Sequence, residues 1–335
     1  MKPWVPLSSL SRQILLFIVG LFVGAIVVKT YFVPTISVQR ANDPNYTYIN
    51  PLLTAGVSEN KEFTEYKPLE AQINKVLSTT GSNVTASVYY RELTAGRWFG
   101  VNENELYSPA SLMKVPIMIS YFKVAENDPS ALSSKIYYDN QNVIADASEH
   151  YVSPEKITKY KTYSIESLIE AMIEHSDNAA TSLLFGSLDS NSFQEVATDI
   201  GLTFPTDIQS LGAKDFMTVK EYSYLFRLLY NGTYLTRPLS EKALGILTKT
   251  DFDKGLRGGV PSTIQIAHKF GERTVISEDG VTQKRELHDC GIIYYPNHPY
   301  LLCVMTKGND FDALSQTIES ISKVVYANAE SRWKK

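Results

Sequence analysis

Residues 107–116 read YSPASLMKVP and combine a helix-start signal with a serine and a lysine three positions apart. Ser108 and Pro109 are typical of an N-cap and a first helical position, so a helix is predicted to begin here. Ser111 and Lys114 would then lie one turn apart on the same helical face. The backbone N–H groups of a first helical turn lack intrahelical partners and favour negative charge. A nucleophilic Ser111 would therefore have its own N–H available to stabilise an oxyanion.

A Ser-x-x-Lys pair is a weak signal by itself, and others begin at Ser58, Ser153, Ser320 and Ser331. The pair at Ser111 differs because its neighbours are apolar and a helix-start signal precedes it. In a partly buried site near another cation, the Lys114 ammonium would lose its proton more easily. Lys114 is therefore predicted to act as the general base that activates the Ser111 hydroxyl.

A second motif, Ser176-Asp177-Asn178, follows a segment whose apolar positions have a helical period. This helix is predicted to start after Ser164 as N-cap and to bury Ile165, Leu168, Ile169, Met172 and Ile173. A hydroxyl at Ser176 can relay a proton to a leaving amine, and the Asn178 amide can hold a substrate carbonyl. Both are predicted site residues.

A third motif, His268-Lys269-Phe270-Gly271, ends a run with strand-like alternation. Lys269 can bind a substrate carboxylate and lower the pKa of Lys114. Gly271 would let a ligand approach the backbone closely, and the backbone N–H of Glu272 is the predicted second oxyanion donor. His268 would project to the opposite face from Lys269, so a structural role is predicted for it.

The three motifs, in this order, resemble the signature of class A β-lactamases and penicillin-binding proteins. The flanks YSPASLMKVP, HSDNAATSLL and LRGGVPSTIQIAHKFGE are similar as well, and the resemblance covers about residues 69–325. It implies a helical lobe and a five-stranded antiparallel sheet flanked by helices, with the site between them. It also implies Ser111 as acyl-accepting nucleophile, Lys114 as its activator, Ser176 as proton relay, and Asn178 and Lys269 as substrate-binding groups.

Two departures from that family bear on activity. The segment 202–219, LTFPTDIQSLGAKDFMTV, lacks the Ω-loop Glu with which class A β-lactamases position a deacylating water, and its carboxylates are Asp207 and Asp215. Phe270 stands where the family has Thr or Ser. We therefore expect β-lactams to acylate Ser111 readily and the acyl-enzyme to hydrolyse slowly. The alternatives are a D-Ala-D-Ala carboxypeptidase acting on peptidoglycan stem peptides and a non-catalytic penicillin-binding sensor domain.

Periodicity in the rest of the chain predicts an α+β fold with one antiparallel sheet assembled from both chain ends. A helix is expected over 69–77, followed by two strands and then a helical block. The predicted strands are 84–91, 97–101, 263–269, 273–277, 291–295 and 300–306, and a last helix is expected over 311–327. One serine hydrolase domain is predicted over 66–335.

The N-terminal region contains ILLFIVGLFVGAIVV at 14–28, close to the length of about 20 residues that spans a bilayer. We expect a cytoplasmic segment 1–12, an uncleaved transmembrane anchor 13–33 and an extracytoplasmic stalk 34–65, oriented by Lys2 and Arg12. The alternatives are a cleaved signal peptide and a buried soluble helix. The first two place the catalytic domain outside the cytoplasm.

The 335 residues carry 32 Lys and Arg against 36 Asp and Glu, a net charge of −4, and 44% are hydrophobic. This composition indicates a globular chain with a sizeable core, and it argues against nucleic-acid binding because there is no basic excess. The histidines show no metal-ligand spacing, so no metal or other cofactor is predicted. A Ser-His-Asp triad remains open, although no Gly-x-Ser-x-Gly elbow is present. We expect a monomeric catalytic domain.

Cys290 and Cys303 are the two cysteines of the chain. If the last two predicted strands pair about a turn at 296–297, these residues lie opposite each other. In an oxidising compartment they could form a cross-strand disulfide. The alternative is a pair of buried reduced thiols, because only a non-hydrogen-bonded pair brings the side chains close enough.

Overall fold

The computed structural model describes residues 47–48, 66–80, 83–139, 149–204, 214–276 and 282–334. All of them belong to one compact unit that spans 42–335, distinct from a second unit over 1–41. The predicted cytoplasmic segment and transmembrane anchor lie outside the described residues. Within those residues, no helix combines the length and apolar character needed to cross a bilayer.

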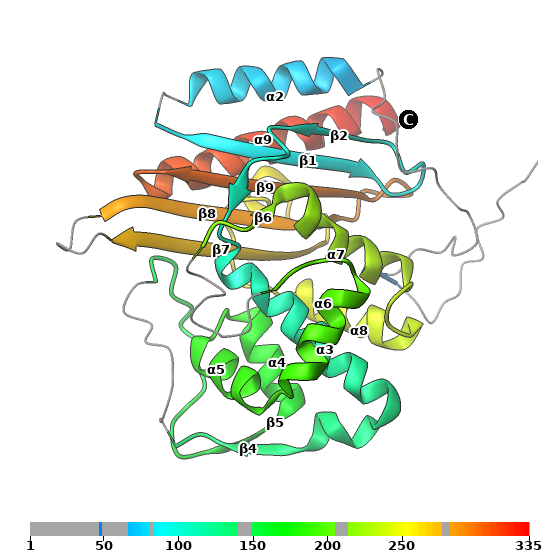
Figure 1. Ribbon diagram of the computed structural model, residues 1–335. Helices are drawn as coiled ribbons and strands as arrows, with labels where there is room; N and C mark the ends of the chain where they lie inside the picture. Colours follow the sequence, from blue (N-terminus) through cyan, green and yellow to red (C-terminus); the bar gives the residue numbers. More distant parts are fainter. Residues whose placement is uncertain are drawn as a thin grey trace, which may run out of the picture. The chain divides into compact units, whose positions relative to one another are not determined.

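A five-stranded antiparallel sheet forms the centre of the unit (Figure 1). Its strand order is β2-β1-β9-β8-β7, so strands from both ends of the domain pair in one sheet, as predicted. The strands are β1 (Thr85–Glu92), β2 (Trp98–Val101), β7 (Ile266–Ile276), β8 (Thr282–Ile293) and β9 (Tyr300–Gly308). Two short pairs accompany it: β3 (Leu106–Tyr107) with β6 (Met217–Thr218), and β4 (Lys135–Tyr137) with β5 (Thr162–Ser164).

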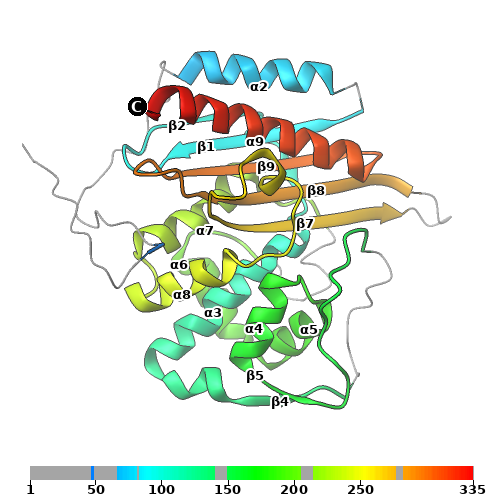
Figure 2. The same ribbon diagram turned by 180° about the vertical axis from the view of Figure 1, so that it is seen from behind.

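Helices cover both faces of the sheet (Figures 1 and 2). α2 (Lys67–Thr79) and α9 (Phe311–Trp333) lie together along one face, and α7 (Val219–Asn231) packs against the other. Beyond α7 lies a helical lobe. It contains α3 (Lys114–Asn127), α4 (Ile165–Glu174), α5 (Asn178–Ser187), α6 (Ser190–Asp199) and α8 (Arg237–Leu247), with the 3-10 turns η3 (Ala110–Met113) and η4 (Pro129–Ser133). A third 3-10 turn, η7 (Arg257–Gly259), packs against α9.

Two hydrophobic clusters hold these layers together. The larger one lies between the helical lobe, α7 and the face of the sheet that α7 covers. The smaller one lies between the other face of the sheet and helices α2 and α9. Helix α4 shows how sequence produces such packing. Ser164 caps it by accepting a hydrogen bond from the N–H of Ser167. All five residues of the predicted apolar face are buried, which confirms that prediction: Ile165, Leu168, Ile169, Met172 and Ile173.

Several predicted boundaries differ from the structure. The strands expected at 263–269 and 273–277 are one continuous strand, β7, and β8 begins at Thr282 rather than at 291. Both strands have polar outer ends that interrupt the apolar alternation. Helix α6 was not predicted, because Asn and Ser dominate its first turn; its apolar residues are buried at helical spacing, at Phe193, Val196 and Ala197.

The helix start predicted at Ser108 and Pro109 is wrong. The chain forms the 3-10 turn η3 first, and α3 begins only at Lys114. Ala110 has a φ of +49°, which no α-helix accommodates. Ser111 therefore lies in a tight turn that precedes the helix, not inside its first turn.

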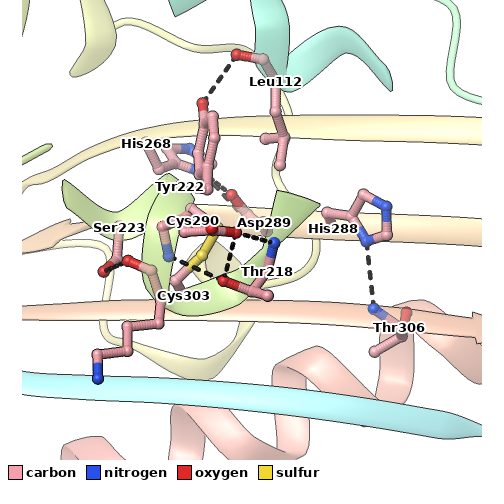
Figure 3. The surroundings of a disulfide bond; sticks show 12 residues. Leu112, Thr218, Tyr222, Ser223, His268, His288, Asp289, Cys290, Cys303 and Thr306 are labelled. Carbon is pink, nitrogen blue, oxygen red and sulfur yellow. Dashed lines mark hydrogen bonds and ion pairs between the residues drawn. A yellow bond between two sulfur atoms is a disulfide. The ribbon is translucent and has the colours of Figure 1, made fainter. Parts of the chain in front are cut away.

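The structure contains a disulfide between Cys290 on β8 and Cys303 on β9 (Figure 3). The two cysteines are directly opposite each other in the register of the two strands, as the strand-pairing argument predicts. Both are fully buried, in the larger hydrophobic cluster.

Two residues of the predicted stalk contact the domain. The N–H groups of Thr47 and Tyr48 donate to the carboxylate of Glu241 on α8. The Tyr48 ring lies 5.5 Å from that of Tyr294 in an edge-to-face contact. The part of the segment at 47–48 is therefore held against the domain and does not serve as a free spacer.

Candidate active site

The turn that carries Ser111 is fixed by hydrogen bonds to its backbone on both sides of the serine. His288 Nε2 donates to the carbonyl of Ser108, and Tyr222 Oη donates to the carbonyl of Leu112, each at 2.9 Å. Figure 3 shows the Tyr222 contact reaching the turn from α7. Ser111 itself is partly exposed. A buried framework thus holds a serine that remains accessible.

His288 is fixed in one tautomer. Its Nδ1 accepts a hydrogen bond from the N–H of Thr306, so Nε2 carries the proton that is donated to Ser108. Full burial lowers the pKa of His288 to about 4. The imidazole is therefore neutral at physiological pH, as this pair of hydrogen bonds requires.

Gly271 on β7 lies against the same turn. A Cβ atom at this position would be 2.8 Å from the carbonyl oxygen of Pro109 and 3.0 Å from the N of Leu112. The absence of a side chain thus lets β7 approach the Ser111 turn. The prediction was that Gly271 lets a ligand approach the backbone; the close contact in the structure is with the chain itself.

Lys114, the first residue of α3, is buried with 3% exposure. Its ammonium donates to the carbonyl of Ser176 at 2.7 Å, to Ser176 Oγ at 3.0 Å and to Asn178 Oδ1 at 2.8 Å. The first and second motifs therefore meet at Lys114.

Ser176 lies where all three motifs converge. Its Oγ accepts one hydrogen bond from Lys114 and another from Lys269, each at 3.0 Å. A hydroxyl has two acceptor positions and one proton. With both acceptor positions occupied by ammonium groups, the Ser176 proton can only be donated elsewhere. This geometry suits the predicted proton relay.

The backbone around Ser176 is shaped for this contact. Ser176 has a φ of +52°, an uncommon conformation for a residue with a side chain. The next residue, Asp177, caps α5 by accepting from the N–H of Ala180 at 2.8 Å. Its other oxygen accepts from the N–H of Ile157 at 2.8 Å. Asp177 therefore has a structural role, which the sequence analysis left unassigned.

Lys269 is fully buried on β7 and donates to Ser176 Oγ and to the carbonyl of Phe270. Burial is the main cause that lowers the pKa of Lys269 well below its usual value, and the nearby Lys114 ammonium lowers it further. The carboxylates of Asp289, Asp251 and Glu149 act in the opposite direction.

His268 on β7 pairs with Asp289 on β8, with Nδ1 and Oδ1 2.9 Å apart. The pair is almost completely buried, and Asp289 Oδ2 also accepts from the N–H of Leu256. His268 therefore joins β7 to β8 and to the segment before η7. Its contacts are those of the structural residue that the alternation predicts.

The Asn178 side chain bridges Lys114 and Glu149. Its Oδ1 accepts from Lys114 Nζ, and its Nδ2 donates to Glu149 Oε1 at 2.6 Å. Glu149 comes from the loop between β4 and β5. Glu149 was not among the predicted site residues, because no motif or helical spacing connects it to the three motifs.

Phe270 brings no hydroxyl to the site, but its ring lies 4.2 Å from Lys269 Nζ. Its ring stacks on Phe252 with centroids 4.2 Å apart, and only 4% of the residue is exposed. The replacement of a hydroxyl residue by Phe270 thus contributes to the cluster between the sheet and α9.

Glu272, the predicted second oxyanion donor, follows Gly271 on β7. Its carboxylate accepts from the N–H groups of His150 and Tyr151, each at 3.0 Å. Burial raises the pKa of the Glu272 carboxyl. The side chain is therefore occupied in holding the 149–151 segment against β7.

Segment 202–219 contains two carboxylates, those of Asp207 and Asp215. Asp207 lies outside the described residues. Asp215 forms ion pairs with Lys284 at 2.8 Å and with Arg273 at 3.4 Å. Its carboxylate is thus committed to two cations on β7 and β8.

A pocket of about 480 Å³ flanks the site and contains a serine, a histidine and an aspartate in its lining. Ser153 Oγ donates to Asp251 Oδ2 at 2.5 Å, and His175 Nδ1 lies 2.9 Å from the same oxygen. Ser153 Oγ and His175 Nδ1 are 3.5 Å apart, too long for proton transfer to the ring. The imidazole is not placed to activate this serine, so the cluster does not form a Ser-His-Asp triad.

The described residues also contain no group of three or more His, Cys, Asp or Glu arranged to hold a metal ion. The convergent polar groups are two buried lysines, one serine hydroxyl and one amide, next to a partly exposed serine. With the mixed fold around them, they define a serine hydrolase of the β-lactamase type.

Comparison with known proteins leads to the same class. The family model described as the beta-lactamase enzyme family matches residues 68–329. The chain therefore belongs to the beta-lactamase enzyme family. No curated protein sequence matches the chain.

Solved structures share the fold. PBP-A aligns with a TM-score of 0.66 and 22% identity, over 82% of this chain and 100% of that one. A mutant of PBP-A, solved as an acyl-enzyme complex with penicillin G, aligns with the same score at 21% identity, over 82% and 100% of the two chains. A variant of the last common ancestor of Gram-negative class A beta-lactamases aligns at 0.66 and 22%, over 79% and 99%.

Proposed function

We propose that this β-lactamase-type serine hydrolase is acylated at Ser111 by β-lactams and releases the acyl group slowly. The observation that carries the proposal is the position of Ser176 Oγ, 3.0 Å from both Lys269 and Lys114, the residue that directly follows the Ser111 turn. Such an arrangement serves acyl transfer, because it provides a base, a proton relay and a cationic anchor beside one nucleophile.

Acylation would begin with neutral Lys114 accepting the Ser111 proton as Ser111 Oγ attacks the carbonyl carbon. The N–H groups of Ser111 and Glu272 would stabilise the oxyanion. As the carbon–nitrogen bond breaks, Ser176 Oγ would give its proton to the leaving nitrogen. A proton from the Lys114 ammonium then replaces the one that Ser176 has lost, so the lysine returns to its neutral form.

Slow deacylation is expected because hydrolysis needs a base that activates water on the acyl-enzyme. Asp215 already accepts from Lys284 and lies close to Arg273. Within the described ranges, segment 202–219 offers no other carboxylate. This supports an enzyme that acylates faster than it hydrolyses. The mutant of PBP-A trapped with penicillin G is a relative in which an acyl-enzyme has been observed.

The same acylation chemistry suits a D-Ala-D-Ala carboxypeptidase acting on stem peptides, and the missing Ω-loop Glu favours this second function over rapid β-lactam hydrolysis. Comparing nitrocefin hydrolysis with D-alanine release from a stem peptide separates the two. Nitrocefin turnover above about 10 per second would contradict slow deacylation. D-alanine release without net nitrocefin turnover would support the peptidase.

We also propose that the catalytic domain lies outside the cytoplasm, anchored by the apolar segment 13–33. The Cys290–Cys303 disulfide supports this location, because disulfides persist in oxidising compartments. Fusing a periplasm-dependent and a cytoplasm-dependent reporter to the C-terminus tests it. Activity of the cytoplasmic reporter alone would refute the proposed orientation.

The decisive test of acylation is intact-protein mass spectrometry over time after addition of benzylpenicillin. The wild type should gain the mass of one penicillin within minutes and lose it over a much longer period. Ser111→Ala should gain none. Ser320→Ala is the matched control, because Ser320 starts another Ser-x-x-Lys and is an exposed residue of α9. This variant should label like the wild type.

Two results would overturn the proposal. If the wild type remains unlabelled, the domain is not acylated by this β-lactam and a sensor role that captures ligand without covalent chemistry becomes the better account. If Ser111→Ala is labelled as fast as the wild type, the nucleophile is another residue.

A further inference from the structure

We propose that Glu149 is a positioning residue that sets the orientation of the Asn178 amide, and through it the acceptor presented to Lys114. The inference deepens the proposed acyl-transfer function and rests on it for its kinetic test. It starts from two hydrogen bonds on opposite ends of one amide: Lys114 to Asn178 Oδ1 at 2.8 Å and Asn178 Nδ2 to Glu149 Oε1 at 2.6 Å.

An Asn amide can turn end for end with little change in shape, so its neighbours decide which end faces which group. In the reverse orientation, the Asn178 NH₂ would face the Lys114 ammonium, which has only donors, and the Asn178 oxygen would face a carboxylate, which has only acceptors. Both contacts would be repulsive. The Glu149 carboxylate and the Lys114 ammonium therefore select the same orientation from opposite sides.

This orientation leaves the amide able to bind substrate. The NH₂ group carries two protons, and Glu149 Oε1 accepts one of them. The second N–H remains for the carbonyl that Asn178 is predicted to hold. Glu149 thus fixes the amide without using its full donor capacity.

Glu149 is itself held in place. Its side chain is only 11% exposed, and its second oxygen lies 3.2 Å from Lys156 Nζ. Further along the same loop, the N–H of Tyr151 donates to Glu272 on β7, and that of Ile157 donates to Asp177. The loop is therefore anchored to the sheet and to the helical lobe.

The charge of Glu149 also acts on the site. It is one of the carboxylates that raise the pKa of Lys269, against the larger effects of burial and of Lys114. A Gln at this position would keep an acceptor for Asn178 and remove the charge. The hydrogen-bond role and the charge of Glu149 can therefore be separated by mutation.

The kinetic test compares acylation by benzylpenicillin in full-length Glu149→Ala and Glu149→Gln. Glu149→Ala should lower the second-order acylation rate constant about 10-fold or more, the effect expected when a charge-assisted hydrogen bond is lost. Glu149→Gln should return it to within about 3-fold of the wild type. In Glu149→Gln the acidic limb of the rate–pH profile should move to lower pH, because the lysines lose a neighbouring negative charge.

Glu155→Ala is the matched control. Glu155 belongs to the same loop, its side chain is 74% exposed, and its carboxylate pairs with His175, which is not one of the predicted site residues. This variant should leave both the rate constant and the pH profile unchanged. Equal acylation rates in Glu149→Ala and the wild type would overturn the proposal, as would equal damage in Glu149→Ala and Glu149→Gln. Loss of deacylation alone would also overturn it, because Glu149 would then be a hydrolytic group.

A second readout needs no substrate and stays informative if penicillin does not label the protein. The Asn178 side-chain NH₂ can be assigned in ¹⁵N-edited NMR spectra by its disappearance in Asn178→Asp. One of its protons should exchange slowly in the wild type and in Glu149→Gln, and quickly in Glu149→Ala. Fast exchange of both protons in the wild type would contradict the proposed contact, whatever the outcome of acylation.

Discussion

At the scale of one residue, Lys269 is a buried lysine whose position is expected to lower the stability of the folded protein. A fully buried ammonium is costly, and this one lies beside a second ammonium with a single hydroxyl oxygen between them. Packing alone would favour an apolar side chain at this buried position. The role proposed for Lys269, binding a substrate carboxylate, would account for a charge at this position.

Replacing Lys269 should therefore make the protein more stable and less active. In Lys269→Met we expect the free energy of unfolding to rise by about 1–3 kcal/mol, because a buried charge and its repulsion with Lys114 are removed. Acylation by benzylpenicillin should fall about 100-fold or more. Thermal unfolding and labelling kinetics measure the two effects.

Lys249→Met is the control for that comparison. Lys249 pairs with Glu174 at the surface, with 60% of its side chain exposed, so the variant should change stability by less than about 0.5 kcal/mol. A fall in stability of Lys269→Met would show that the lysine is a net stabilising group.

His288 should make stability depend on pH. Its pKa is lower in the folded protein, at about 4, than in the unfolded chain, at about 6.5. As pH falls through this window, the unfolded chain binds the proton first, so the free energy of unfolding decreases by up to about 3 kcal/mol. Above pH 6.5 the contribution is constant. Chemical denaturation between pH 4 and 8 measures the slope.

His288→Gln should flatten that slope. His298→Gln is the control, because His298 follows β8 and stacks on Trp333 of α9. If both variants retain the wild-type slope, another group causes the pH dependence.

The site residues divide at this scale into those that sequence reveals and those that it does not. Ser111, Lys114, Ser176 and Lys269 were predictable because each belongs to a short motif with local context. The roles assigned to them remain predictions until tested by acylation. Glu149 was not predictable, because its relation to Asn178 arises only when a loop between two short strands folds back over the site.

At the scale of elements, β7 packs closely against the Ser111 turn η3 at Gly271. Gly271→Ala would place a methyl group 2.8 Å from the carbonyl oxygen of Pro109. Because backbone cannot move aside at little cost, we expect a loss of about 1–3 kcal/mol in stability. Acylation should slow as well, since Ser111 lies in the turn that must shift.

Gly186→Ala provides the opposite control. Gly186 is in helix α5, and a Cβ there would meet no atom within 4 Å. This variant should gain about 0.5–1 kcal/mol, because Ala loses less conformational entropy in a helix. Equal stability of the two variants would show that β7 can move away from η3 at no cost.

The predictability of the elements followed the strength of their periodicity. The buried face of α4 was predicted residue by residue because Ser164 caps a strongly amphipathic run. The start of α3 was mispredicted because Ser108 and Pro109 carry a local helix signal that tertiary contacts override. The Ser108 carbonyl is bound by His288 of β8 instead. No local pattern contains that partner.

At the scale of the whole molecule, the disulfide between β8 and β9 should make the stability of the domain depend on an oxidising environment. Cys290 and Cys303 close a loop with a sequence separation of 13 residues, for which chain entropy predicts about 3 kcal/mol. Reduction should lower the free energy of unfolding by about that amount. Mass measurement after thiol alkylation, with and without reductant, should show no free thiols in the native protein.

The alternative from the sequence, two buried reduced cysteines, gives the opposite mass result. Two alkylated thiols without reductant, under denaturing conditions, would remove the disulfide and with it the structural support for an oxidising compartment. Ser replacement of both cysteines is the matched control for the effect of reductant, and its stability should not respond to reductant.

The pairing of β1 with β9 also governs how the molecule comes into being. During synthesis the β1–β2 hairpin is made long before β9, so one edge of β1 has no backbone partner until the final strands arrive. Unpaired strand edges invite aggregation, and pairing across such a separation is slow. The nascent chain thus depends on its last strand and helix to bury an early hairpin. A ribosome that stalls before residue 300 would release a product with neither a closed sheet nor an assembled catalytic centre.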